Sequence, residues 1–126
     1  MRKLHQVAAA TACAISALML SGNVLAQDAG AAPKKEVTGK DLAFDRKKGN
    51  CLACHGMPTQ PDAESTGLYG PPLIAMSARF PDKAKLRAQI WDATAINPSS
   101  TMIPFGKHGV LSEKEIDKIT DFVYGL

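Results

Sequence analysis

The sequence of 126 residues is poor in cysteine and histidine, with three of each. A structural zinc site takes four Cys or His ligands, yet outside residues 51–55 the chain offers only Cys13, His5 and His108. A second C-x-x-C pair is absent, and no alternation of apolar and polar residues predicts a strand before Cys51, as a thioredoxin-like dithiol would require. Zinc and dithiol sites are therefore the weaker interpretations of the cysteines.

The chain also lacks a large excess of charge and a long apolar run. Its formal net charge of +3 argues against a nucleic-acid partner, which would need a strongly basic surface. The apolar stretch at residues 7–20 is too short for the roughly 20 residues that span a membrane. It follows Arg2 and Lys3 and precedes Ala26, as in a secretory signal peptide. We expect cleavage after Ala26, a periplasmic location and no membrane anchor.

Cleavage would leave residues 27–126, enough for one domain. The net charge would fall to +1, because only Arg2 and Lys3 are lost, and Cys13 would be removed. Residues 27–37 are small and polar, which predicts a flexible arm. Residues 38–126 are then the folded domain.

Three stretches of this domain have helical patterns. The first begins at Gly39, with Thr38 or Asp41 as its cap and Gly49 as its end. The second covers residues 83–94, with Leu86, Ile90 and Trp91 on its buried side, and ends at Asn97 and Pro98. The third covers residues 113–124, where Ser112 and Glu115 match a capping box, and would bury Ile116, Ile119, Val123 and one of Phe122 or Tyr124. The pattern predicts an all-α domain.

The most informative residues are Cys51, Cys54 and His55, which form a C-x-x-C-H motif. This is the attachment signature of a c-type haem. Two thiols at this spacing reach the two vinyl groups of one porphyrin, and the histidine that follows becomes the proximal iron ligand. We therefore predict one covalent haem c.

The segment between His55 and Phe80 is rich in glycine and proline and is predicted to be an ordered loop around the porphyrin. A metal-bound histidine usually donates its second ring N–H to a carbonyl. Pro71, within Gly-Pro-Pro-Leu at 70–73, is the candidate for that carbonyl. The alternative is that the prolines only stiffen the loop.

Four possibilities exist for the other side of the iron: Met102, His108, Met76 or an open site. Met102 is favoured because prolines at 98 and 104 brace its non-helical segment and because a thioether is a soft ligand. Met76 lies in an apolar run typical of a core methionine. His/Met ligation would raise the reduction potential and block small-molecule binding.

Basic residues flank the haem motif. Arg46, Lys47 and Lys48 precede it and would either steer an acidic redox partner or form only a solvated helix end. Arg79 is a candidate partner for a haem propionate.

Together, these motifs resemble a specific family, the small monohaem cytochrome subunit (the X subunit) of the Sox thiosulfate-oxidising system. The resemblance covers residues 43–126. It is carried by the haem motif, by Gly-Pro-Pro-Leu at 70–73, by Asn97-Pro98 followed by the segment at 101–106, and by the closing helix from residue 111.

The resemblance implies a class I cytochrome c-like domain with three to four helices around the haem. It also implies a periplasmic heterodimer with a larger cytochrome, the A subunit, which couples thiosulfate oxidatively to a cysteine of a carrier protein. In this L-cysteine S-thiosulfotransferase complex the chain would be the non-catalytic electron-transfer subunit, passing electrons to a downstream cytochrome. With its thiols used as thioethers the mature chain would have no free cysteine, so the sulfur chemistry must belong to the partner. A free-standing class I cytochrome c shuttle remains the alternative, and a haem sensor or peroxidase would need an open iron site.

Overall fold

The computed structural model describes residues 35–64 and 66–126. The expected signal peptide, with Cys13, and the arm up to residue 34 lie outside the described residues. The elements in chain order are α1 (Gly39–Phe44), η1 (Cys51–Ala53), α2 (Met76–Arg79), α3 (Lys83–Trp91), η2 (Ala93–Ala95) and α4 (Glu113–Tyr124), where η marks a 3₁₀ helix. No strand occurs in the described ranges, which confirms the all-α prediction. None of the helices described there is long and apolar enough to cross a membrane.

Helix α1 is shorter than expected. Thr38 caps its start, and Asp41 completes a capping box, so both candidate capping residues take part. The prediction that Gly49 ends the helix is wrong, because α1 stops at Phe44. The carboxylate of Asp45 accepts the backbone N–H of Lys47 (2.8 Å), a local bond that competes with the helix. The chain then folds back until the Gly49 N–H donates to the carbonyl of Leu42 (3.0 Å).

Helix α3 also ends earlier than predicted, at Trp91 and not at residue 94. Asp82 caps its start, and Leu86 and Ile90 are buried, as predicted. The carboxylate of Asp92 stops the helix, because it accepts the Thr94 N–H and begins η2. Helix α3 thus ends six residues before Asn97, which was expected to end it.

Helix α4 has the predicted bounds, and the capping box of Ser112 and Glu115 is present. Its Ile116, Ile119 and Val123 are buried, as predicted. The fourth buried residue is Thr120, whose hydroxyl donates to the carbonyl of Ile116 (2.7 Å). The prediction that Phe122 or Tyr124 is buried is wrong, because both are half-buried.

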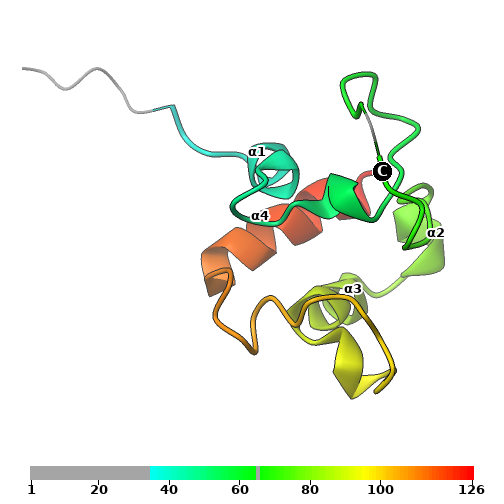
Figure 1. Ribbon diagram of the computed structural model, residues 1–126, viewed down its shortest axis with the longest axis vertical. Helices are drawn as coiled ribbons and strands as arrows, with labels where there is room; N and C mark the ends of the chain where they lie inside the picture. Colours follow the sequence, from blue (N-terminus) through cyan, green and yellow to red (C-terminus); the bar gives the residue numbers. More distant parts are fainter. Residues whose placement is uncertain (1–34, 65) are drawn as a thin grey trace, which may run out of the picture. The chain divides into compact units, whose positions relative to one another are not determined.

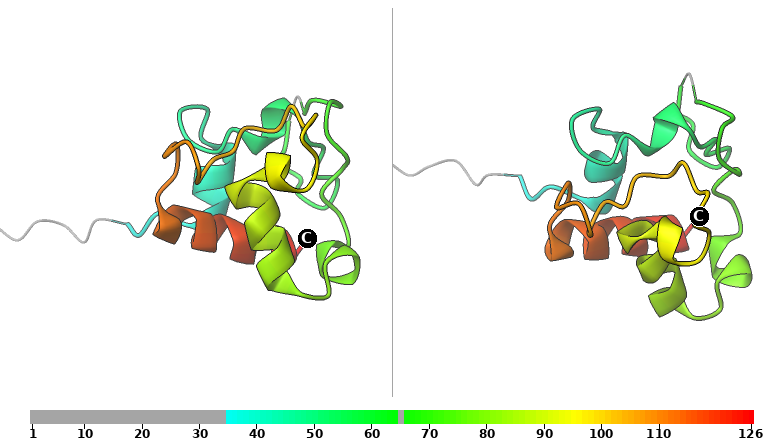
Figure 2. Two further views of the ribbon diagram at one scale, coloured as in Figure 1. Left: turned by 90° about the horizontal axis from the view of Figure 1, so that it is seen from below. Right: turned by 60° about the horizontal axis from the view of Figure 1, so that its bottom comes forward.

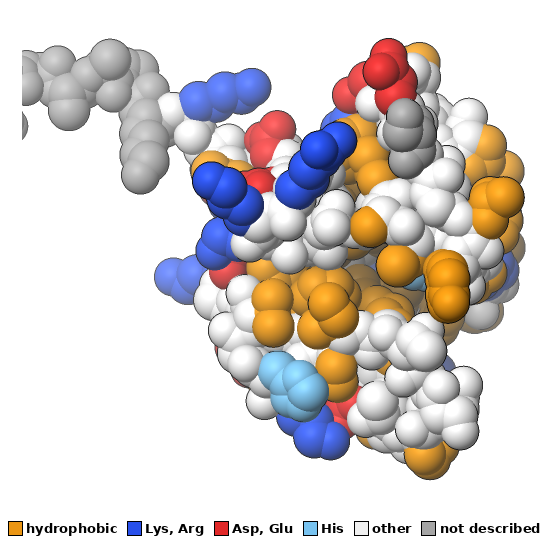
Figure 3. All heavy atoms as spheres, in the orientation of Figure 1, with side chains coloured by type: hydrophobic (Ala, Val, Ile, Leu, Met, Phe, Trp, Pro, Cys, Tyr) orange, Lys and Arg blue, Asp and Glu red, His pale blue; other side chains and the backbone are white. Residues whose placement is uncertain are grey.

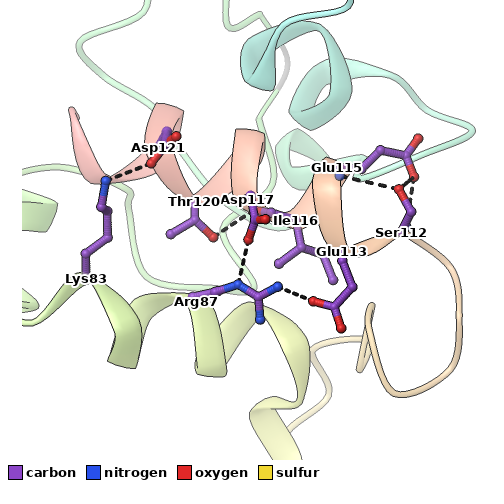
Figure 4. Close-up of polar contacts among 9 residues, drawn as sticks. All are labelled: Lys83, Arg87, Ser112, Glu113, Glu115, Ile116, Asp117, Thr120 and Asp121. Carbon is purple, nitrogen blue, oxygen red and sulfur yellow. Dashed lines mark hydrogen bonds and ion pairs between the residues drawn. The ribbon is translucent and has the colours of Figure 1, made fainter.

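Helix α4 organises the core. In Figure 1, α1 lies on one side of α4 and α3 on the other, and both helices pack on it. The views in Figure 2 show the same arrangement. Phe44 of α1 meets Phe122 of α4 edge to face, with ring centroids 6.2 Å apart. Ion pairs join α3 to α4 (Figure 4). Lys83 pairs with Asp121. Arg87 pairs with both Glu113 and Asp117.

The long segment between the haem motif and α3 is a loop, as predicted, but it includes one helical turn, α2. Ala75, just before α2, has a left-handed backbone with φ 50°. Its N–H donates to the carbonyl of the C-terminal Leu126 (2.7 Å). This contact ties the start of α2 to the end of α4.

Candidate cofactor site

A cavity of about 690 Å³ lies among η1, the loop at 69–73, α2, α3, the segment at 97–105 and α4. This volume falls within the range of about 300–1,000 Å³ that is typical of ligand sites. Much of the lining is apolar, and Figure 3 shows hydrophobic side chains gathered around a hollow. Its apolar lining includes Leu73, Leu86, Ile90, Phe105, Leu111, Ile119 and Val123. The cavity is therefore suited to a flat, mainly apolar group.

Cys51 and Cys54 line the cavity from one turn of 3₁₀ helix. Asn50, with a left-handed φ of 46°, precedes this turn, and the His55 N–H donates to the Cys51 carbonyl (2.9 Å). Both thiols are free in the structure. Burial raises the pKa of the Cys51 thiol to about 11, so this thiol is protonated and uncharged at neutral pH. The turn brings both sulfurs and the imidazole to the same cavity.

The imidazole of His55 is fixed by the proline loop. Its Nδ1 lies 2.7 Å from the carbonyl oxygen of Pro71, so the hydrogen bond anticipated from the Gly-Pro-Pro-Leu segment is present. Because a carbonyl only accepts, Nδ1 carries the proton and Nε2 keeps its lone pair for a metal. The ring packs closely on Gly70, where an added Cβ would lie 2.3 Å from its Cε1 atom. Sequence reasoning missed this role of Gly70.

The three side chains considered as the second iron ligand differ in their exposure and in whether they line the cavity. Met102 is half-buried and lines the cavity. Met76 also lines it, although only 2% of its surface is exposed. His108 is exposed and is not part of the lining. Met102 and Met76 are therefore the two ligand candidates that the fold brings to the cavity.

The segment that carries Met102 is braced at both ends. Before it, the Ser100 hydroxyl accepts the Met102 N–H (3.2 Å). After it, the N–H groups of Gly106 and Lys107 donate to the Trp91 carbonyl (3.1 and 3.3 Å). The Lys107 ammonium pairs with Asp92 (2.8 Å), and this bond, with those from Thr94, lowers the pKa of Asp92 to about 2. The end of α3, at Trp91 and Asp92, thus holds the chain just after the Met102 segment.

The basic residues at 46–48 line the cavity, in the turn after α1. Lys48 pairs with Glu115 (2.8 Å). Arg79 also lines the cavity, and its Nη1 donates to the carbonyl of Pro72 (2.8 Å) and to the sulfur of Met76 (3.3 Å). Sequence reasoning missed both Arg79 contacts.

This lining fits a covalent haem. It combines two thiols in one turn, an imidazole with a free Nε2, a thioether and an apolar enclosure. A zinc site finds no support within residues 35–64 and 66–126, where no three His, Cys, Asp or Glu side chains gather to hold a metal ion. A thioredoxin-like dithiol would require a strand before the cysteines, and this part of the chain has none.

Comparison with known proteins supports the fold. No protein-family model matches the sequence. An uncharacterized lipoprotein of Aquifex aeolicus (strain VF5) is 35% identical over 78 residues, which cover 62% of this chain and 37% of that protein. The chain thus spans little more than a third of the length of this relative. The crystal structure of SoxXA from P. pantotrophus is similar with a TM-score of 0.62 and 24% identity, over 68% of this chain and 77% of that one. The predicted all-α, cytochrome c-like fold is therefore confirmed.

Proposed function

We propose that this chain is a monohaem c-type cytochrome and the electron-accepting subunit of a periplasmic thiosulfate-oxidising complex. One observation carries the proposal: the C-x-x-C-H turn and Met102 line the same apolar cavity, with His55 held by Pro71. The fold likeness to SoxXA favours this kind of complex.

In this proposal Cys51 and Cys54 hold the haem through thioethers, and His55 and Met102 bind its iron. The bound haem supplies a metal centre that takes up and releases one electron. The Pro71 carbonyl fixes the plane of the His55 ring and makes the imidazole a stronger donor. The Met102 thioether, a soft ligand, favours the reduced state and raises the reduction potential.

If His55 and Met102 both bind the iron, the chain would have no position at the metal for thiosulfate. The thioethers also use both cysteines of the described residues, and Cys13 would leave with the signal peptide. The coupling of thiosulfate to a carrier cysteine must therefore occur on a partner, the larger cytochrome subunit. The electrons then pass through this chain to a downstream cytochrome.

The surface around the cavity suits such a partner. Leu68 and Tyr69 are 91% and 87% exposed, and Ile103 is 50% exposed. Tyr69 and Ile103 both line the cavity, so exposed apolar surface adjoins the candidate site. Exposed apolar surface of this kind is typical of interaction sites. The lipoprotein relative is consistent with an exported chain.

Reconstitution tests this function. Thiosulfate plus carrier protein should reduce this haem rapidly only when the larger subunit is present. Replacing both Leu68 and Tyr69 by Ser should weaken association and slow the reduction. Replacing Ile96, which is 67% exposed and does not line the cavity, is the matched control and should leave both unchanged. Equal reduction of the isolated chain, or no association, would replace the subunit proposal with a free electron shuttle.

A further inference from the structure

The segment proposed to carry the second iron ligand is a closed loop, because both of its ends are attached to the end of α3. At its start, the Asn97 N–H donates to the carbonyl of Ala93 (3.1 Å). At its end, the Gly106 N–H donates to the carbonyl of Trp91 (3.1 Å). We call residues 97–107 the Met102 loop.

The middle of the Met102 loop has few attachments of its own. Among the described residues, no hydrogen bond or ion pair joins residues 98–103 to the chain outside the loop. The Met102 N–H donates to the hydroxyl of Ser100, which lies within the loop (3.2 Å). The residues on either side of Met102 are exposed, although Phe105 is buried. The position of Met102 therefore depends on how firmly the ends of the loop are held.

An ion pair between side chains joins the end of the loop to the end of α3. The Lys107 ammonium donates to Oδ2 of Asp92 (2.8 Å). The other carboxylate oxygen, Oδ1, accepts both the backbone N–H (3.0 Å) and the hydroxyl of Thr94. Asp92 is 8% exposed and is the one charged residue that is buried in the described part of the chain. Because Thr94 fixes the carboxylate, Asp92 holds Lys107 from a defined position.

We propose that Asp92 is a positioning residue for the second iron ligand: its bond to Lys107 keeps the Met102 loop closed, and the closed loop keeps the thioether at the iron. This inference rests on the proposed binding of the iron by Met102. Surface ion pairs contribute little, because water screens them and both side chains must be immobilised. Here the carboxylate is buried and already fixed, while the Lys107 side chain is 55% exposed. Loss of the pair should therefore shift the loop toward its open state by a factor of about five.

Binding of neutral imidazole to the ferric haem-loaded protein tests the proposal, because imidazole can bind the iron only where Met102 has left it. When few molecules have an open loop, the apparent affinity for imidazole is proportional to the open fraction. Asp92→Asn should therefore bind imidazole about fivefold more tightly than the unsubstituted protein. Lys107→Met, which changes the exposed side of the pair, should give the same increase. Lys107→Arg keeps the charge and should retain most of the original, weaker affinity.

The two variants distinguish loop closure from a change of charge near the iron. Asp92→Asn removes a negative charge and Lys107→Met removes a positive one, so a purely electrostatic effect would have opposite signs. The double variant should bind imidazole no more tightly than either single variant, because each loses the same bond. Asp121→Asn is the matched control: it breaks an ion pair of similar length (2.7 Å to Lys83) away from the loop and the cavity lining, and the affinity should not change.

An unchanged imidazole affinity in Lys107→Met would overturn the role assigned to Asp92, and so would changes of opposite sign in the two single variants. In a Met102→Ala background, Asp92→Asn should have no further effect; a further increase would also overturn the proposal, because Asp92 would then act without Met102. Failure of the proposed function is distinct. Met102→Ala would then bind imidazole as weakly as the unsubstituted protein, or the unsubstituted protein would carry no covalent haem.

Discussion

Gly70→Ala should disturb the candidate site directly, because the added methyl group would meet the ring of His55. The new Cβ would lie 2.3 Å from Cε1 and 2.5 Å from Nδ1 of His55. Carbon atoms in contact are about 3.5–4.0 Å apart, so the ring must move by about 1 Å. Movement on that scale is incompatible with the 2.7 Å hydrogen bond to Pro71.

The expected loss is large for so small a change. Overpacking costs about 1–3 kcal/mol, and the lost hydrogen bond contributes about 1 kcal/mol. The free energy of unfolding should therefore fall by about 2–4 kcal/mol. For a domain of this size each kcal/mol corresponds to about 4–8 °C in Tm, so Tm should fall by at least about 8 °C. The haem-loaded variant should also lose part of its low-spin spectrum, because His55 is displaced.

Thermal unfolding by circular dichroism and the visible spectrum measure the two effects. Gly56→Ala is the matched control in the same loop, because its Cβ would meet only Thr66 Oγ1 at 3.7 Å and Pro72 Cβ at 4.0 Å. Neither glycine has a left-handed φ, so backbone strain does not separate the variants. Equal Tm values and equal spectra for the two variants would refute the role assigned to Gly70.

Three further predictions concern stability. Ser112→Ala should cost about 1 kcal/mol through loss of the N-cap, measured by urea unfolding. In the unsubstituted protein Lys48 and Ser112 lower the pKa of Glu115 from 4.5 to about 2. The ionised Glu115 therefore adds to the free energy of unfolding above pH 4.5, and this stabilisation is lost as the pH falls toward 2. Because Ser112→Ala removes part of the pKa shift, its stability should drop less on acidification. Ala75→Gly should raise the free energy of unfolding by up to about 1 kcal/mol, because the left-handed φ of 50° is unfavourable for alanine; a decrease would contradict this. Gly106→Ala would place a Cβ 2.0 Å from Cε3 of Trp91 and should cost about 1–3 kcal/mol; an unchanged Tm would contradict this.

The sequence was most informative where the signal is local. The capping box at Ser112 and Glu115 and the periodic apolar residues of α4 predicted that helix to the residue. The Gly-Pro-Pro-Leu segment predicted the carbonyl that Pro71 presents to His55.

Helix ends were less predictable because single carboxylates decide them. Asp45 and Asp92 each bond to backbone N–H groups two residues ahead and stop α1 and α3 early. Helical periodicity contains no information on whether an aspartate side chain points to solvent or to its own backbone.

The contacts that distinguish Met76 from Met102 were also beyond sequence reasoning. They depend on the helical turn α2, four residues long and preceded by a left-handed alanine. A helix of four residues is too short for a periodic pattern to predict it. Only the fold shows that Arg79 reaches both the Pro72 carbonyl and the Met76 sulfur.

Covalent haem on Cys51 and Cys54 is the central claim, and peptide mass spectrometry tests it most directly. Tryptic digestion of the exported protein gives a peptide covering residues 49–79, which contains no internal Lys or Arg. After extraction with acidified acetone, this peptide should retain the mass of one haem. Loss of the haem to the solvent, with two unmodified or disulfide-linked cysteines left in the peptide, would contradict the account.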